Sequence, residues 1–140
     1  MLLFLPVHYL THRAYPTLET PPIYGVGPAE LDYEFVKVGL KVWPIRSMLL
    51  YGGLVLSTTV HMVDGMTIIW NTNLKDAIPS FRLESWKKSD RSRRMALILG
   101  GVALPVLAGL FALAKEPVLV FKSLASRYEA VFLSSFMYRF

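Results

Sequence analysis

Cysteine is absent from this 140-residue chain. Its absence excludes disulfide bonds, zinc–thiolate sites, iron–sulfur clusters and cysteine nucleophiles, although it does not define the redox compartment. Charge is also scarce, because 18% of the residues are charged, against about 25% in typical soluble proteins. Hydrophobic residues make up 54% of the chain. We therefore expect lipid or partner helices to cover the excess apolar surface.

The motifs of soluble enzymes are absent as well. The sequence contains no glycine-rich phosphate loop, no Ser-His-Asp arrangement in a recognisable context, no paired carboxylates and no His-Glu-x-x-His metal motif. We therefore predict no catalytic residues, no metal site and no enzymatic activity.

Two stretches are long and apolar enough to predict membrane-spanning helices. Residues 95 to 114 carry no charged side chain, and a helix of this length covers roughly 30 Å, the thickness of the hydrocarbon core. Residues 48 to 70 carry one formal charge, Asp64, and end at Trp70, a residue type typical of the membrane–water interface. The predicted fold class is an all-α membrane protein with two full transmembrane helices.

The remaining segments predict shorter helices within one transmembrane domain that covers the whole chain. Residues 1 to 12 are too few to cross a bilayer and lack the features of a signal peptide, so we expect the end of a longer helix in a chain shortened at its N-terminus. Residues 28 to 43 place apolar side chains at helical spacing beside Lys37 and Lys41, which predicts an amphipathic interfacial helix. Residues 117 to 138 predict an amphipathic terminal helix.

A face of small and polar residues runs along the predicted helix at residues 48 to 70. Gly53, Ser57, His61 and Gly65 recur every four residues and share one side of that helix. Glycines let a neighbouring helix approach closely, and Ser57 and His61 would each contribute about 0.6 to 2 kcal/mol through hydrogen bonds across the interface. We predict that this face makes helix-packing contacts.

Polar side chains within an apolar stretch also indicate a candidate site. His61 and Asp64 are such residues, because a charge in hydrocarbon costs at least about 2.5 kcal/mol. Two imidazoles on neighbouring helices can hold haem, and His8 or His12 would be the second ligand to His61. Two alternatives stay open at this point: helix packing without a cofactor, and a haem b-binding membrane anchor for electron transfer.

Basic residues are concentrated between the two predicted spans. A cluster in this place can set the orientation of the flanking helices or bind anionic lipid headgroups. Topology determination is the favoured interpretation, and headgroup binding is the alternative. The cluster consists of Lys87, Lys88, Arg91, Arg93 and Arg94.

Several short segments carry a resemblance to a known family. They are His8-Tyr-Leu-Thr-His12-Arg13, Glu30-Leu-Asp-Tyr-Glu-Phe-Val36, Trp43-Pro-Ile-Arg-Ser47, His61-Met-Val-Asp-Gly65 with Ile68-Ile-Trp-Asn71, and Ser126-Arg-Tyr-Glu129. In these segments the chain resembles the transmembrane domain of the MCP family. Its members are fungal mitochondrial outer-membrane proteins first known as suppressors of loss of the endoplasmic reticulum–mitochondria tether.

The resemblance implies an integral protein of the mitochondrial outer membrane that acts in lipid homeostasis, without catalytic activity, as an adaptor at membrane contact sites. The predicted partners are membrane lipids and a bridge-like lipid-transfer protein or another helical membrane subunit, and not nucleic acid. The family layout is also similar to the membrane-anchor subunits of succinate dehydrogenase and fumarate reductase, which keeps the haem alternative open without assigning ligands. Family members carry further upstream helices and a tail with the adaptor motif, so a third interpretation is a fragment without function.

Overall fold

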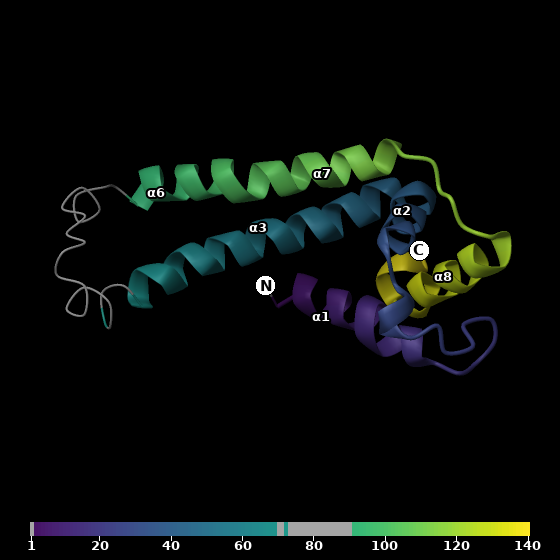
Figure 1. The fold of residues 1–140 in the computed structure, drawn as a ribbon. Helices are drawn as coiled ribbons and strands as arrows, with labels where there is room; N and C mark the ends of the chain where they lie inside the picture. The colour runs from purple at the N-terminus through teal and green to yellow at the C-terminus, as the bar shows by residue number, and fades with distance from the viewer. Residues whose placement is uncertain (1, 70–71, 73–90) are drawn as a thin grey trace. The chain divides into compact units, whose positions relative to one another are not determined.

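The computed structural model describes residues 2 to 69, 72 and 91 to 140. All regular elements in this part of the chain are helices, which confirms the predicted all-α class (Figure 1). The chain divides into two compact units. The first comprises Met1–Leu54 and Ala108–Phe140, and the second comprises Val55–Leu107.

The first helix of the chain changes its winding before a proline. α1 (Phe4–Tyr9) continues as a π-helix (Leu10–Ala14) and a 3-10 turn (Tyr15–Thr17). Proline has no backbone N–H, and its ring clashes with the carbonyl four residues earlier in an α-helix. The wider π turn upstream of Pro16 relieves that clash. The helix therefore extends beyond residues 1 to 12, where it was predicted.

The second helix begins later than the sequence pattern predicted. The predicted helix covered residues 28 to 43, whereas α2 runs over Tyr33–Val42 after a short 3-10 turn at Pro28–Glu30. Asp32 is the N-cap residue, because its side chain accepts a hydrogen bond of 2.9 Å from the backbone N–H of Glu34. An aspartate cap satisfies one of the free N–H groups at a helix start, so the residues before it belong to the loop.

A tight bend joins α2 to the longest helix. α3 covers Pro44–Ile69, and it begins before residue 48 because proline is well suited to the first turn of a helix. The fully buried Ser47 donates a hydrogen bond of 2.7 Å to the carbonyl oxygen of Gly39 in the last turn of α2. This contact holds the two helices together across the bend.

The C-terminal helix packs on α2 inside the first unit (Figure 1). α8 covers Lys122–Ser134 and is followed by a 3-10 turn at Phe136–Tyr138, whereas the predicted helix covered residues 117 to 138. Residues 117 to 121 are not helical. The core of this unit is built from buried side chains of α1, α2, α3 and α8, of the loop before α2 and of the C-terminal 3-10 turn: Val7, Ile23, Val26, Phe35, Val38, Leu50, Tyr128, Val131, Phe132 and Tyr138.

One helix in the described part of the chain is long and apolar enough to cross a membrane. It covers Met95–Lys115 and has 21 residues, almost none of them buried. It is built from α6 (Arg91–Ile98), a π-helix (Leu99–Ala103) and α7 (Leu104–Lys115). As in the first helix, the π turn lies directly upstream of a proline, here Pro105.

The second predicted span coincides with α3, which does not meet the same criterion. Its middle carries Ser57, His61 and Asp64, which lower its mean hydropathy. A helix of 26 residues extends about 39 Å, enough to cross the hydrocarbon core. A second transmembrane helix therefore stays a prediction.

Candidate functional site

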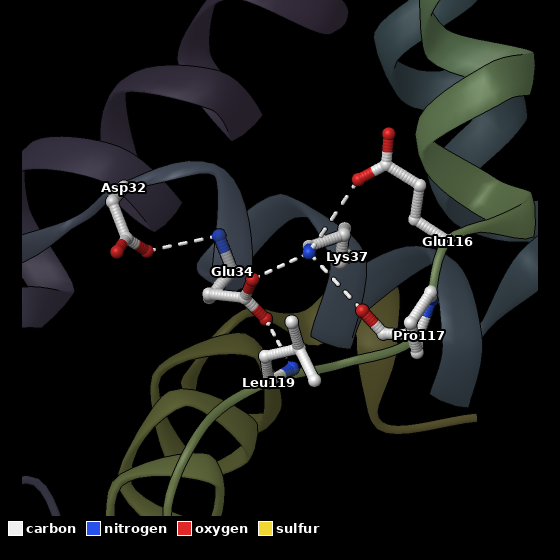
Figure 2. Close-up of polar contacts among 6 residues, drawn as sticks. All are labelled: Asp32, Glu34, Lys37, Glu116, Pro117 and Leu119. Carbon is white, nitrogen blue, oxygen red and sulfur yellow. Dashed lines mark hydrogen bonds and ion pairs between the residues drawn. The ribbon is translucent and has the colours of Figure 1, made fainter.

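A buried cation marks the most developed polar site among the described residues (Figure 2). Lys37 lies on α2 with only 6% of its side chain exposed. Its ammonium group forms an ion pair with Glu34 one turn earlier and a second, longer one of 3.6 Å with Glu116. It also donates a hydrogen bond of 3.1 Å to the carbonyl oxygen of Pro117. Burying a lysine is unfavourable unless it is paired, and these three acceptors offset that cost.

Glu34 completes the site from the same helix turn. Its carboxylate accepts a hydrogen bond of 2.8 Å from the backbone N–H of Leu119 while it pairs with Lys37. Lys37 thus binds the carbonyl oxygen of Pro117, and Glu34 binds the N–H of Leu119, so both side chains hold the segment after α7 (Figure 2). We call this arrangement the α2 clamp, formed by Glu34 and Lys37 with Glu116, Pro117 and Leu119.

Glu34 and Lys37 shift the pKa of each other. The hydrogen bond from Lys37 is the main reason that the pKa of Glu34 lies below its usual 4.5, and the bond from Leu119 lowers it further. The hydrogen bond to Glu34 likewise raises the pKa of Lys37 above 10.5. Glu34 therefore contributes stability above pH 4.5, and that contribution is lost as the pH falls through its lowered pKa. The contribution of Lys37 is lost only as the pH rises through its raised pKa.

We expect Lys37→Met to lower the hydrogen-exchange protection factor of the Leu119 amide. Without the cation the pKa of Glu34 rises toward its usual value. As the pH is lowered, Glu34 therefore becomes protonated earlier in the variant than in the wild type, and it then accepts the Leu119 hydrogen bond less well. NMR on the detergent-solubilised protein should show that the variant loses the protection of the Leu119 amide at a higher pH than the wild type does. Lys41→Met is the matched control, because Lys41 is exposed on the same helix, and equal protection in both variants would contradict the clamp.

The N-terminal histidines form a second polar cluster in the first unit. The rings of His8 and His12 lie 4.3 Å apart, and His12 Nε2 shares a hydrogen bond of 3.1 Å with the Tyr51 hydroxyl. His8 Nδ1 is buried and has no hydrogen-bond partner among the described residues. Beside the His8 ring lies a cavity of about 10 Å³, lined by Phe4, Val7, His8, Thr11, Leu50, Tyr51 and Tyr138.

These features do not fit a haem ligand at His8 or His12. The cavity volume of about 10 Å³ is that of about one water molecule, and the ring nitrogen of His12 already bonds to Tyr51. His61, the other predicted ligand, is exposed on α3. Among the described residues, no three His, Cys, Asp or Glu side chains are grouped to hold a metal ion.

We expect the purified protein to show no stoichiometric b-type band in a reduced-minus-oxidised absorption spectrum. The protein would be expressed with haem supplied and purified in a mild detergent, and α-helical circular dichroism would show that it is folded. A stoichiometric band that disappears in His61→Ala would contradict this expectation and favour electron transfer.

The predicted packing face on α3 divides between the two units. Gly53 lies in the first unit, where an added Cβ would overlap the ring of Phe4. Ser57 and Gly65 are partly buried in the second unit, His61 is exposed, and a Cβ on Gly65 would meet no atom within 4 Å. The structure thus assigns an intrachain contact to Gly53, and packing by the other three residues stays a prediction. Asp64 is partly buried on the same stretch of α3.

The predicted basic cluster lies mostly beyond what the structure describes. Lys87 and Lys88 lie outside the described residues. The same holds for Trp70 and Asn71, which mark the predicted end of the span at residues 48 to 70. Arg91 and Arg94 belong to the first turn of α6, and only their backbone is described. Arg93, in the same turn, is exposed. Headgroup binding and topology determination therefore stay predictions for this cluster.

Two further anchoring residues lie on α8, within the segment Ser126-Arg-Tyr-Glu129 that carries the family resemblance, and the sequence assigned them no role. Arg127 donates a hydrogen bond of 2.8 Å to the carbonyl oxygen of Ile23 and one of 3.2 Å to that of Tyr24. The Tyr128 hydroxyl donates one of 3.1 Å to the carbonyl oxygen of Glu30. These bonds hold the long loop before α2 against α8. No local pattern indicates them, because their partners are more than 90 residues away, whereas the spacing of Glu34 and Lys37 is a recognised helical ion-pair spacing.

The fold combines a helical core unit with an apolar helix of membrane-spanning length, and this combination is that of an α-helical membrane protein. The model of the family described as "MDM10-complementing protein 1, transmembrane domain" matches residues 3–125. The match covers most of the chain, and the protein belongs to this family. The predicted membership of the MCP family is therefore confirmed. Comparisons with curated proteins and with solved structures gave no match.

Proposed function

We propose that this chain is a noncatalytic integral protein of the mitochondrial outer membrane that acts in lipid homeostasis as an adaptor at membrane contact sites. The observation that carries the proposal is the family match over residues 3–125. The family description itself links such domains to MDM10 complementation, and the remaining steps are part of the proposal.

Integral membrane insertion is supported by the exposure of the Met95–Lys115 helix. A buried core helix of a soluble protein would hide most of its apolar side chains, whereas almost none of this helix is buried. We propose α3 as the second transmembrane helix. Its polar residues would then face other helices or the bundle interior, where intramembrane polar groups are usually found.

A structural rather than catalytic role is supported by the partners of the polar side chains in the first unit. Lys37, Ser47, Arg127 and Tyr128 all donate to backbone carbonyl oxygens of other segments. Side chains engaged in this way position the chain and are not available for acid–base chemistry on a substrate. The proposed partners are membrane lipids and a bridge-like lipid-transfer protein or another helical membrane subunit.

Complementation in fungal cells that lack MDM10 tests the proposal. The expressed chain should restore growth and should remain in the mitochondrial membrane fraction after alkaline carbonate extraction. Retention without restored growth would overturn the lipid-homeostasis role, and release by carbonate would overturn integral insertion. An equally expressed Phe132→Ala variant controls for folding, because it removes a fully buried ring from the core of the first unit.

A further inference from the structure

The segment between α7 and α8 presents an unusual surface. Residues 117 to 121, which we call the strap, follow the candidate span directly and are not helical. We infer that the strap is a lipid-contact site, in which Leu119 and Phe121 enter the boundary between headgroups and acyl chains. This inference rests on the membrane assignment and not on the proposed adaptor role.

Burial alternates along the strap. Val118 and Val120 are partly buried against the core of the first unit, whereas Leu119 is 76% exposed and Phe121 is 86% exposed. An extended chain points successive side chains to opposite sides. A strap whose outer side faced water would be expected to carry polar residues there. Large apolar residues on both sides indicate that the outer side also faces an apolar medium.

The α2 clamp satisfies two polar backbone groups of this non-helical segment. Unpaired backbone N–H and C=O groups are costly at the edge of hydrocarbon, and helices normally satisfy them internally. In the strap, Glu34 accepts from the N–H of Leu119, and Lys37 donates to the carbonyl oxygen of Pro117 (Figure 2). Pro117 itself has no N–H to satisfy. The clamp thus fixes the backbone so that the two exposed apolar side chains point away from the core.

Charge around the strap suits an anionic membrane surface. Lys115 ends the candidate span and Lys122 begins α8, and both are exposed. Glu116, which directly precedes the strap, pairs with Lys37 at 3.6 Å, and Glu34, which accepts from Leu119, pairs with the same ammonium group, so that Lys37 offsets the repulsion of both carboxylates from anionic headgroups. Basic residues beside apolar ones are typical of chains that lie in the membrane interface.

The strap is more favourably placed to contact a bilayer than a protein, because it is continuous with the candidate span. The strap begins two residues after the last residue of a helix of membrane-spanning length. Leu119 and Phe121 follow the end of the span by four and six residues, so an extended chain places them no more than about 14 and 22 Å from it, which is within reach of the membrane interface. A second copy of the chain or another protein would have to displace that lipid.

Site-directed fluorescence tests the inference directly, because the chain has no cysteine. Leu119→Cys and Phe121→Cys would each be labelled with the fluorophore NBD and reconstituted into vesicles of phosphatidylcholine and phosphatidylserine. Glu19→Cys is the control, since Glu19 is an exposed acidic residue of the first unit. We expect several-fold less quenching by aqueous iodide at the two strap positions than at Glu19, together with strong quenching by lipids that carry a nitroxide near the headgroup.

Each other outcome would overturn a stated part of the inference. Iodide quenching equal to that at Glu19 would show that the strap faces water. Shielding from iodide without quenching by nitroxide lipids would assign the surface to a second copy or another protein. Adding Glu34→Ala should reduce nitroxide quenching at Leu119, because the strap loses the acceptor of its backbone N–H, and no change would refute the role of the clamp. None of these readouts depends on MDM10 complementation.

Discussion

Replacing Gly53 with leucine is expected to displace α1 from α3 in the first unit. A Cβ at this position would overlap the aromatic ring of Phe4, and the remaining leucine atoms would need still more space. Phe4 packs against the core residues of this unit, so displacing its ring disturbs the packing of α1 on that core. Overpacking of this kind typically costs about 1 to 3 kcal/mol. Limited proteolysis of the N-terminal helix and chemical unfolding in detergent would measure the effect.

Gly65→Leu is the matched control for this prediction. It lies on the same face of the same helix, but a Cβ there would meet no atom within 4 Å. Replacing a helical glycine that has room for a Cβ also gains up to about 1 kcal/mol of helix propensity. We therefore expect no loss of stability in Gly65→Leu. If Gly65→Leu instead lowered the stability as much as Gly53→Leu, the predicted face would be packed along its whole length.

Truncating Phe132 to alanine is expected to produce the largest loss of stability in the first unit. Its side chain is fully buried and stacks on Phe35 with the ring centroids 4.4 Å apart. It also contacts Trp43 and Tyr138, and it fills the space above Gly39, where an added Cβ would lie 2.7 Å from its ring. Phenylalanine-to-alanine changes at such sites cost about 3 to 5 kcal/mol, because they remove buried area and leave a cavity.

Phe136→Ala provides the comparison for Phe132. Phe136 follows the same helix but is 54% exposed, so its removal leaves no enclosed cavity in the chain. The free energy of unfolding in detergent should fall much more for Phe132→Ala than for Phe136→Ala. Equal losses would mean that the C-terminal helix does not pack on α2 as described. Because Gly39 and Phe132 are closely apposed, mutations at these two positions should not be additive.

Local patterns in the sequence predicted the helices themselves. The uncharged run at residues 95 to 114 predicted the candidate span, which the structure places at Met95–Lys115. The apolar spacing of Leu31, Phe35, Val38 and Val42 predicted α2. Phe35 and Val38 are buried, whereas Val42 is 45% exposed. Boundaries were predicted less well, because caps and prolines act over a few residues. With Asp32 as its N-cap, α2 begins after the predicted residue 28, and α3 begins at Pro44, before the predicted residue 48.

The candidate site was only partly predictable. The predicted packing face on α3 included Gly53, but its intrachain neighbour Phe4 lies 49 positions earlier in the chain. The histidine pair was predicted as a set of alternative ligands, whereas the structure joins His12 to Tyr51. Such pairings depend on how the helices pack, and no pattern within one helix carries that information.

Composition, helical spacing and the resemblance of short segments by themselves determined the class, the family and the helices of this protein. Those properties depend on interactions within a few residues or on transfer of a segment into lipid, and both are local. Only the tertiary structure decided which polar residues matter. Lys37 and Lys41 are chemically identical and lie one turn apart on α2, yet Lys37 is buried and Lys41 is exposed. The difference arises because Glu116 and Pro117, some 80 residues further along the chain, return to α2 at Lys37 and supply the acceptors that a buried ammonium requires.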